Sequence, residues 1–178
     1  MTEKELREHL ENRNMEVSLY SGVWFGDEVV VFGLWNLMGQ LVGYQQYRPY
    51  APKTQSNDPR LGRYYTLCSK QGGRGIVTAW GLETVKPDKP VLLCEGIFDA
   101  CRLHKVGIPA LAVLGSDPVH LEEWLSIFAQ PLVSVVQGDA AGKKLAKYGG
   151  TGVLLPPGHD VGSLSDEDFY RIFNRFTQ

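Results

Sequence analysis

The sequence predicts an α/β protein in which a small β-rich (α+β) subdomain precedes a parallel sheet with flanking helices. Residues 17–47 are rich in valine and aromatic residues and are interrupted by turn residues. After Pro90, wholly apolar runs alternate with segments of helical pattern. Strands of a covered parallel sheet lose the polar alternation of half-exposed strands, so this alternation indicates a sheet with helices on both faces.

The length fits two small domains. A chain of 178 residues is long enough for one medium domain or two subdomains. The segment VKPDKP at 85–90 separates the two sequence textures. We therefore expect a β-rich N-terminal subdomain at 1–88 and a parallel-sheet domain at 89–178.

The composition is that of a globular protein. Apolar residues make up 43% of the chain and charged residues 21%, which excludes wholesale disorder. No apolar run approaches the ~20 residues that span a bilayer, and the charged N-terminus does not resemble a signal peptide. The three cysteines have no disulfide or zinc spacing. These features predict a cytoplasmic protein without a membrane partner.

The first half begins with a helix and continues as an antiparallel sheet. Thr2 and Glu5 fit a capping box, and the helix is expected to end near Asn14. The runs VWF, VVVFGLW and QLVGYQQY then read as strands separated by turns. Residues 49–75 predict a long loop around one short strand at 64–67.

The region from Gly43 to Gly75, which includes this loop, is strongly basic although the whole chain has a net charge of −2. Its charged residues give a local charge of +5 and are Arg48, Lys53, Asp58, Arg60, Arg63, Lys70 and Arg74. Local Lys and Arg are what phosphate contacts require. A solvated loop face is the ordinary alternative. The tyrosines at 44, 47, 50, 64 and 65 could stack on bases, but packing in the β subdomain is the favoured interpretation.

The second half predicts strands at VLLC, ALAVLG, LVSVVQ and GVLLPP. Helical segments between them are IFDACRLHKVG, HLEEWLSIFA and the start of AAGKKLAKYG. Ser165 caps a closing amphipathic helix whose first turn is acidic.

Three acids follow these strands. Glu95 comes directly after VLLC, Asp99 falls in the first turn of the next helix, and Asp139 follows LVSVVQ. Functional groups gather at the carboxyl ends of parallel strands, so we expect the three carboxylates to converge. Converging acids repel one another unless a cation lies between them, and oxygen ligands suit Mg²⁺. Helix N-terminal capping is the alternative role for each acid.

These residues carry a family resemblance. VLLCEGIFDACRLHKVGIPALAVLGS resembles the first motif of Toprim domains, and VVQGDAAGKKLA with VLLPPGHDVGSLSDEDF resembles the later motifs in primases of the bacterial and bacteriophage type. VFGLWNLMGQLVGYQQYRP and GRYYTLCSKQGGRGIVTAWGLE are similar to the β-rich subdomain that precedes Toprim there. The resemblance covers nearly the whole chain and implies a Toprim-type parallel sheet.

One position departs from the family pattern. The Asp-x-Asp-x-x-Gly motif has Gln137 at its first acid position. Glutamine offers an oxygen but no charge, so metal affinity and activity are expected to fall. Asp117 or Asp160 could supply a replacement carboxylate. A P-loop interpretation of residues 138–143 is disfavoured because Lys144 stands where Ser or Thr should be.

The resemblance implies a nucleotidyltransferase, a DNA-directed RNA polymerase that makes primers on single-stranded DNA in a bacterial or phage-infected cell. Glu95, Asp99 and Asp139 would be its catalytic and metal-binding residues, with Mg²⁺ or Mn²⁺ as cofactor. Contacts to nucleoside triphosphate or template would come from Arg48, Lys53, Arg63, Lys70 and Lys143. No zinc-finger spacing or helicase motor is visible, so a replicative helicase or template-recognition protein would act in trans.

Two other functions stay open. A Toprim nuclease would use the same metal site for cleavage. A catalytically weakened accessory protein would bind single strands without chemistry, which the glutamine at 137 favours.

Overall fold

The computed structural model describes residues 1–178 except 54–56, 69–77, 116–117, 139, 150 and 178. The chain forms two compact units, Met1–Thr78 and Ala79–Gln178. The predicted boundary, between residues 88 and 89, lies further along the chain than this one, just before the parallel sheet begins. That boundary stays a prediction.

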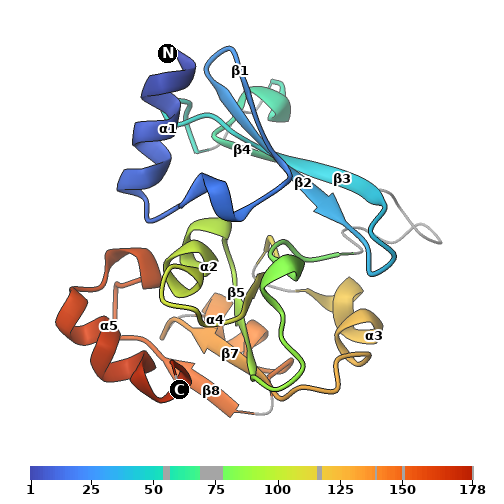
Figure 1. Ribbon diagram of the computed structural model, residues 1–178, viewed down its shortest axis with the longest axis vertical. Coiled ribbons are helices and arrows are strands. Elements are labelled where there is room, and N and C mark those ends of the chain that lie inside the picture. The colour runs from blue at the N-terminus through green and yellow to red at the C-terminus, as the bar shows by residue number, and fades with distance from the viewer. Residues whose placement is uncertain (54–56, 69–77, 116–117, 139, 150, 178) are drawn as a thin grey trace. The chain divides into compact units, whose positions relative to one another are not determined.

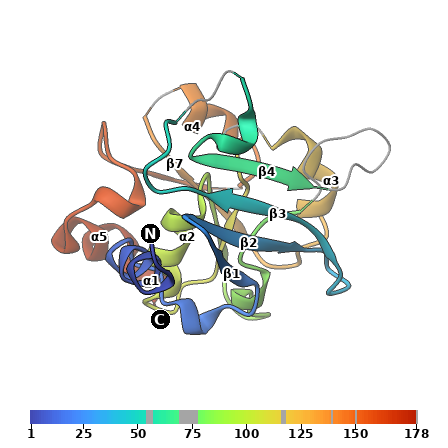
Figure 2. The same cartoon turned by 90° about the horizontal axis from the view of Figure 1, so that it is seen from above.

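The described residues of the first unit form an antiparallel sheet and an α-helix (Figures 1 and 2). The sheet order is β1-β2-β3-β4, so each strand pairs with its neighbour in sequence. The elements are α1 (Glu3–Asn12), β1 (Val23–Gly26), β2 (Val29–Trp35), β3 (Leu41–Tyr47) and β4 (Tyr64–Cys68). The predicted β-rich unit and the short strand after Pro59 are therefore present.

Local sequence explains how α1 begins and where it packs. The Thr2 hydroxyl accepts a hydrogen bond from the Glu5 amide, and the Glu5 carboxylate accepts one from the Thr2 amide, which completes the predicted capping box. Leu6 and Leu10 are fully buried, as are Phe32 and Leu34 of β2. The apolar stripe of the helix thus belongs to the core of this unit.

The second unit is a parallel sheet with the strand order β6-β5-β7-β8. All three pairings are parallel. Its strands are β5 (Val91–Cys94), β6 (Ala110–Ala112), β7 (Leu132–Val136) and β8 (Thr151–Leu154). Its helices are α2 (Ile97–His104), α3 (Glu122–Leu125), α4 (Ala140–Leu145) and α5 (Asp166–Phe173). This arrangement confirms the predicted α/β class.

Alternation along β5 divides the core between the two faces of the sheet. Val91 and Leu93 pack in one cluster with Leu125 of α3 and Leu145 of α4. Leu92 and Cys94 alternate with them and are also buried. The helix α2 contacts β5 and β6. The strand is covered on both faces, as its unbroken apolar sequence predicted.

One helix is shorter than its sequence predicted. HLEEWLSIFA suggested a helix of several turns, but α3 spans only Glu122–Leu125, after a 3₁₀ turn at Val119–Leu121. The Ser126 hydroxyl donates to the Glu123 carbonyl oxygen at 2.7 Å, a local bond that competes with continued helix formation. In the described part of the chain, no helix is both long and apolar enough to cross a membrane.

Candidate functional site

A pocket lies at the carboxyl ends of the central strands of the parallel sheet. Glu95 follows β5 directly, Asp99 lies in the first turn of α2, and Gln137 follows β7. The pocket is lined by Cys94, Glu95, Asp99, Val135, Gln137, Gly142, Leu145, Leu155 and Val161. Two of the predicted acids and the departing glutamine therefore border one pocket at the edge where α/β sheets bind ligands.

The two acids differ in environment. Glu95 is exposed, whereas Asp99 is half-buried. The Asp99 carboxylate accepts a hydrogen bond from the Gly162 amide at 3.2 Å, across 63 positions of sequence. Asp99 also lies at the dipole-positive end of α2, which stabilises its negative charge. The Gly162 amide, which lies outside α2, thus holds the Asp99 carboxylate in place.

The oxygen donors around this pocket fit a hard divalent cation. Glu95 and Asp99 provide carboxylates and Gln137 provides a neutral amide oxygen, which suits Mg²⁺ or Mn²⁺ with some water retained. Burial, with the nearby Asp99 charge, raises the pKa of the Cys94 thiol well above its usual value, so this sulfur does not offer a thiolate.

The structure describes two of the three predicted acids, Glu95 and Asp99. Asp139 and the substitute candidate Asp117 lie outside the described residues. Among the residues that are described, no three His, Cys, Asp or Glu side chains are grouped closely enough to hold a metal ion.

The second substitute candidate, Asp160, lies close to the pocket. Its carboxylate accepts a hydrogen bond from the Ser163 amide at 2.7 Å and caps the 3₁₀ turn Val161–Ser163. A Cβ placed on Gly162 would lie 3.5 Å from Asp160 Oδ1 and 3.9 Å from Asp99 Oδ1. Both carboxylates therefore border the same glycine.

The glycine at the last position of the 137–142 motif, Gly142, has a steric cause. A Cβ at this position would lie 2.0 Å from the Gln137 carbonyl oxygen and 2.7 Å from its amide nitrogen. Only glycine allows α4 to begin so close to the end of β7. This close approach fixes the backbone of Gln137 beside the pocket.

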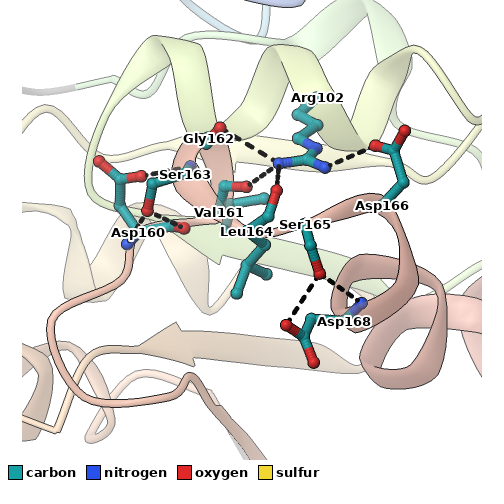
Figure 3. Close-up of polar contacts among 9 residues, drawn as sticks. All are labelled: Arg102, Asp160, Val161, Gly162, Ser163, Leu164, Ser165, Asp166 and Asp168. Carbon is teal, nitrogen blue, oxygen red and sulfur yellow. Dashed lines mark hydrogen bonds and ion pairs between the residues drawn. The ribbon is translucent and has the colours of Figure 1, made fainter.

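A buried arginine near the pocket was not foreseen from the sequence. Arg102, on α2, binds the backbone of the segment that leads into α5 (Figure 3). The sequence signal was available: a basic residue within the apolar helix IFDACRLH is unusual unless it has buried partners.

The predicted basic residues of the first unit have partly structural positions. Arg48 Nε donates to the Arg60 carbonyl oxygen at 3.3 Å, and Arg63 Nε donates to the Ala51 carbonyl oxygen at 2.9 Å. Lys53 is exposed, and Lys70 lies outside the described residues. The two arginines help to shape the loop, while Lys53 extends from it into solvent.

The tyrosines of this unit separate into packed and exposed side chains. Tyr47 is 2% exposed, and its hydroxyl is bonded by His9 at 2.8 Å and by Arg13 at 3.2 Å. Burial raises the pKa of Tyr47 and lowers the pKa of His9. Tyr50, in contrast, is 80% exposed. Tyr47 is a packing residue, as expected, whereas Tyr50 leaves a ring surface accessible.

The remaining predicted contact, Lys143, lies exposed on α4 beside the motif that contains Gln137. It therefore lies on the same helix as Gly142 and Leu145, two residues of the pocket.

No protein-family model matches the chain, and no curated protein matches it. Solved structures do match. The Aquifex aeolicus primase, with its zinc-binding and RNA polymerase domains, superposes with a TM-score of 0.63 at 24% identity over 97% of this chain and 45% of that one. The DnaG catalytic core gives 0.62 at 20% identity over 98% and 59%. The primase fragment of the bacteriophage T7 primase-helicase protein gives 0.61 at 14% over 84% and 63%.

These matches establish architecture across both units. The chain spans 45 to 63% of the length of these three solved chains. The chain has the fold of the catalytic core of bacterial and phage primases.

Proposed function

We propose that this chain is the core of a primase-type, metal-dependent RNA polymerase that makes short primers on single-stranded DNA during bacterial or phage replication. The observation that carries the proposal is the pocket at the ends of β5 and β7, in a chain with the primase-core fold. Glu95, Asp99 and Gln137 face one site there.

Glu95 and Asp99, with Asp139, would hold Mg²⁺ or Mn²⁺. The bound cation would neutralise charge on a nucleoside triphosphate and on the attacking and leaving oxygens. The carboxylate of Asp99, held by the Gly162 amide, would orient one side of the site, while the exposed Glu95 would be accessible to solvent and substrate. The protein contributes positioning and charge, which is what phosphoryl chemistry mainly requires.

Basic residues would bind the template or the triphosphate. Lys53 and Lys143 are exposed, and Arg48, Arg63 and Lys70 complete the candidate set. A DnaG catalytic domain of the same fold is described as bound to single-stranded DNA, and a Mycobacterium tuberculosis primase domain as bound to double-stranded DNA. The phage T7 neighbour is a fragment of a primase-helicase protein, which supports association with a helicase; for this chain we propose a helicase or template-recognition protein acting in trans. A cytoplasmic location belongs to the same proposal.

A primer-synthesis assay tests the proposal. Purified protein, single-stranded DNA, ribonucleotides and Mg²⁺ or Mn²⁺ should yield short RNA. The double substitution Glu95→Gln and Asp139→Asn should lower the yield by about 100-fold or more, because it removes two charges from the site. The control Asp88→Asn with Glu122→Gln changes two exposed acids of the second unit and should retain activity. Unchanged yield in the Glu95/Asp139 variant would refute the proposal.

A second candidate follows from Gln137 at the pocket. With a neutral residue there, the site would bind single strands but turn over weakly or not at all. The substitution Gln137→Asp then provides the test, since an added carboxylate should raise Mn²⁺ affinity and primer yield about tenfold. Robust synthesis by the unaltered chain would exclude this candidate. Metal-dependent nicking of DNA without nucleotides would instead indicate a Toprim nuclease.

A further inference from the structure

Arg102 is a buried cation inside an apolar helix face. Its side chain is 8% exposed. One guanidinium nitrogen, Nη1, donates to three backbone carbonyl oxygens, at 2.9 Å to Val161, 3.1 Å to Gly162 and 2.6 Å to Leu164 (Figure 3). A buried charge is costly unless its donors are satisfied, and these carbonyls satisfy the N–H groups of Nη1.

Two further contacts complete the surroundings of the guanidinium. Nη2 donates to Asp166 Oδ1 at 2.9 Å, and the guanidinium carbon lies 4.7 Å from the centre of the Phe169 ring. The Asp166 side chain is 92% exposed, so solvent screens this ion pair and it contributes little. The carbonyl cluster and the ring therefore fix the arginine.

The segment that Arg102 binds also contacts the pocket. The Gly162 amide donates to Asp99 Oδ1, the Gly162 carbonyl accepts from Arg102, and Val161 lines the pocket. Asp99 and Arg102 are three residues apart on α2 and so lie on neighbouring turns of one helix face. The helix thus holds the turn Val161–Ser163 at two points, one anionic and one cationic.

We propose that Arg102 is a positioning residue for Asp99: it holds the Val161–Leu164 segment where the Gly162 amide fixes the Asp99 carboxylate. This inference rests on the proposed function only for the consequence in catalysis. Outer contacts of this kind commonly change metal affinity or activity about 10- to 100-fold when removed.

Two substitutions separate charge from geometry. Arg102→Met keeps much of the apolar stem but removes every donor. Arg102→Lys keeps the charge on a single nitrogen that cannot reproduce the planar fork between the carbonyls and Asp166. Arg171→Met is the matched control, because Arg171 lies on α5 in an exposed pair with Asp168.

The first measurement is amide hydrogen exchange in the full chain. In Arg102→Met the Gly162 amide should exchange at least about tenfold faster than in the wild type, and in Arg102→Lys the increase should be smaller. The amides of Leu93 and Val135, which lie in the sheet, should keep their protection. Arg171→Met should leave all three amides unchanged. Loss of protection at Leu93 and Val135 in the methionine variant would signal unfolding, in which case the lysine variant decides.

The second measurement is binding of Mn²⁺ alone, followed by primer synthesis. Mn²⁺ affinity should fall about tenfold in Arg102→Met, with part of it restored in Arg102→Lys. In the synthesis assay the Mn²⁺ concentration for half-maximal rate should rise while the KM for template stays constant.

The outcomes keep the two proposals distinct. The positioning role would be overturned if both Arg102 variants showed the same Gly162 exchange rate and the same Mn²⁺ affinity as the wild type. This holds whether or not the variants synthesise primers. If the unaltered chain makes no primers, the proposed function fails, and faster Gly162 exchange in the variants would still support the positioning role.

Discussion

At the scale of single residues, His104 is a buried imidazole in the core of the second unit. Its Nε2 lies 2.9 Å from the Ala110 carbonyl oxygen, and its ring stacks on Trp80 with 5.7 Å between centroids. A neutral ring with the proton on Nε2 donates to that carbonyl. Burial lowers the pKa of His104 to about 4, so the ring is neutral at physiological pH.

The lowered pKa predicts a loss of stability in acid. Between pH 6.5 and about 4 the unfolded chain binds a proton at His104 that the folded chain does not, so the free energy of unfolding falls as pH falls through that window. The group accounts for up to about 3 kcal/mol over the window. Urea unfolding at a series of pH values should show this fall in the wild type.

His104→Gln provides the comparison. It keeps a side-chain amide donor but cannot titrate, so the difference in unfolding free energy between wild type and variant should narrow as pH falls from 6.5 to 4. A difference that is independent of pH would contradict the assignment. Direct NMR titration of the His104 ring gives an independent measurement.

The residues of the site show what sequence can predict at this scale. The positions of Glu95 and Asp99 followed from sequence because each is set by the strand just before it. The partners of Arg102 did not, because they are backbone carbonyls about 60 positions away that carry no side-chain signature. The glutamine at position 137, where the family motif has an acid, could be recognised from the sequence. That Gln137 lines the pocket became clear only from the fold.

At the scale of elements, the connection from β7 to α4 depends on one close approach. The Gly142 position leaves no room for a Cβ beside the Gln137 carbonyl. Alanine ordinarily stabilises a helix by about 1 kcal/mol relative to glycine. Here the backbone clash reverses that preference, because one of the two elements must move.

We expect Gly142→Ala to lower the free energy of unfolding by about 1–3 kcal/mol. Gly138→Ala, in the same connection, is the control, since a Cβ there meets nothing within 4 Å. Its effect should stay within about 0.5 kcal/mol. Equal stability of the two variants in denaturant unfolding would show that α4 can shift freely.

Elements with strong local signals were predicted well. The capping box of α1, the apolar strands of the parallel sheet and the Ser165 cap of α5 all occur, the last with the Ser165 hydroxyl accepting from the Asp168 amide at 3.1 Å. The short α3 was not predicted, because the apolar periodicity continues beyond Ser126, whose hydroxyl bond to the Glu123 carbonyl oxygen competes with continued helix formation.

At the scale of the whole molecule, charge is distributed unevenly. The net charge is −2, yet the segment from Gly43 to Gly75 carries an excess of five positive charges. The one acid of this segment, Asp58, is already subtracted in that excess and pairs with Arg60 at 2.8 Å. Lys53 is exposed and is the clearest candidate for a phosphate contact in the described part of this segment.

Salt dependence tests that assignment. If Lys53 contacts one phosphate of a single strand, Lys53→Gln should weaken DNA binding for all sequences and reduce the slope of log affinity against log salt by about 0.7. Fluorescence anisotropy with a labelled oligonucleotide over a salt series measures the slope. Lys105→Gln, an exposed lysine after α2, should leave it unchanged. An unchanged slope in Lys53→Gln would place the contact elsewhere.

The bond from Gly162 to Asp99 has a consequence for the order of folding. Its two ends are 63 residues apart, and the strands β6, β7 and β8 lie between them in sequence. Contacts that close such long loops form late, after local structure has appeared. A nascent chain can therefore form this bond only once the segment beyond β8 has been synthesised, although Glu95 and Asp99 are made much earlier.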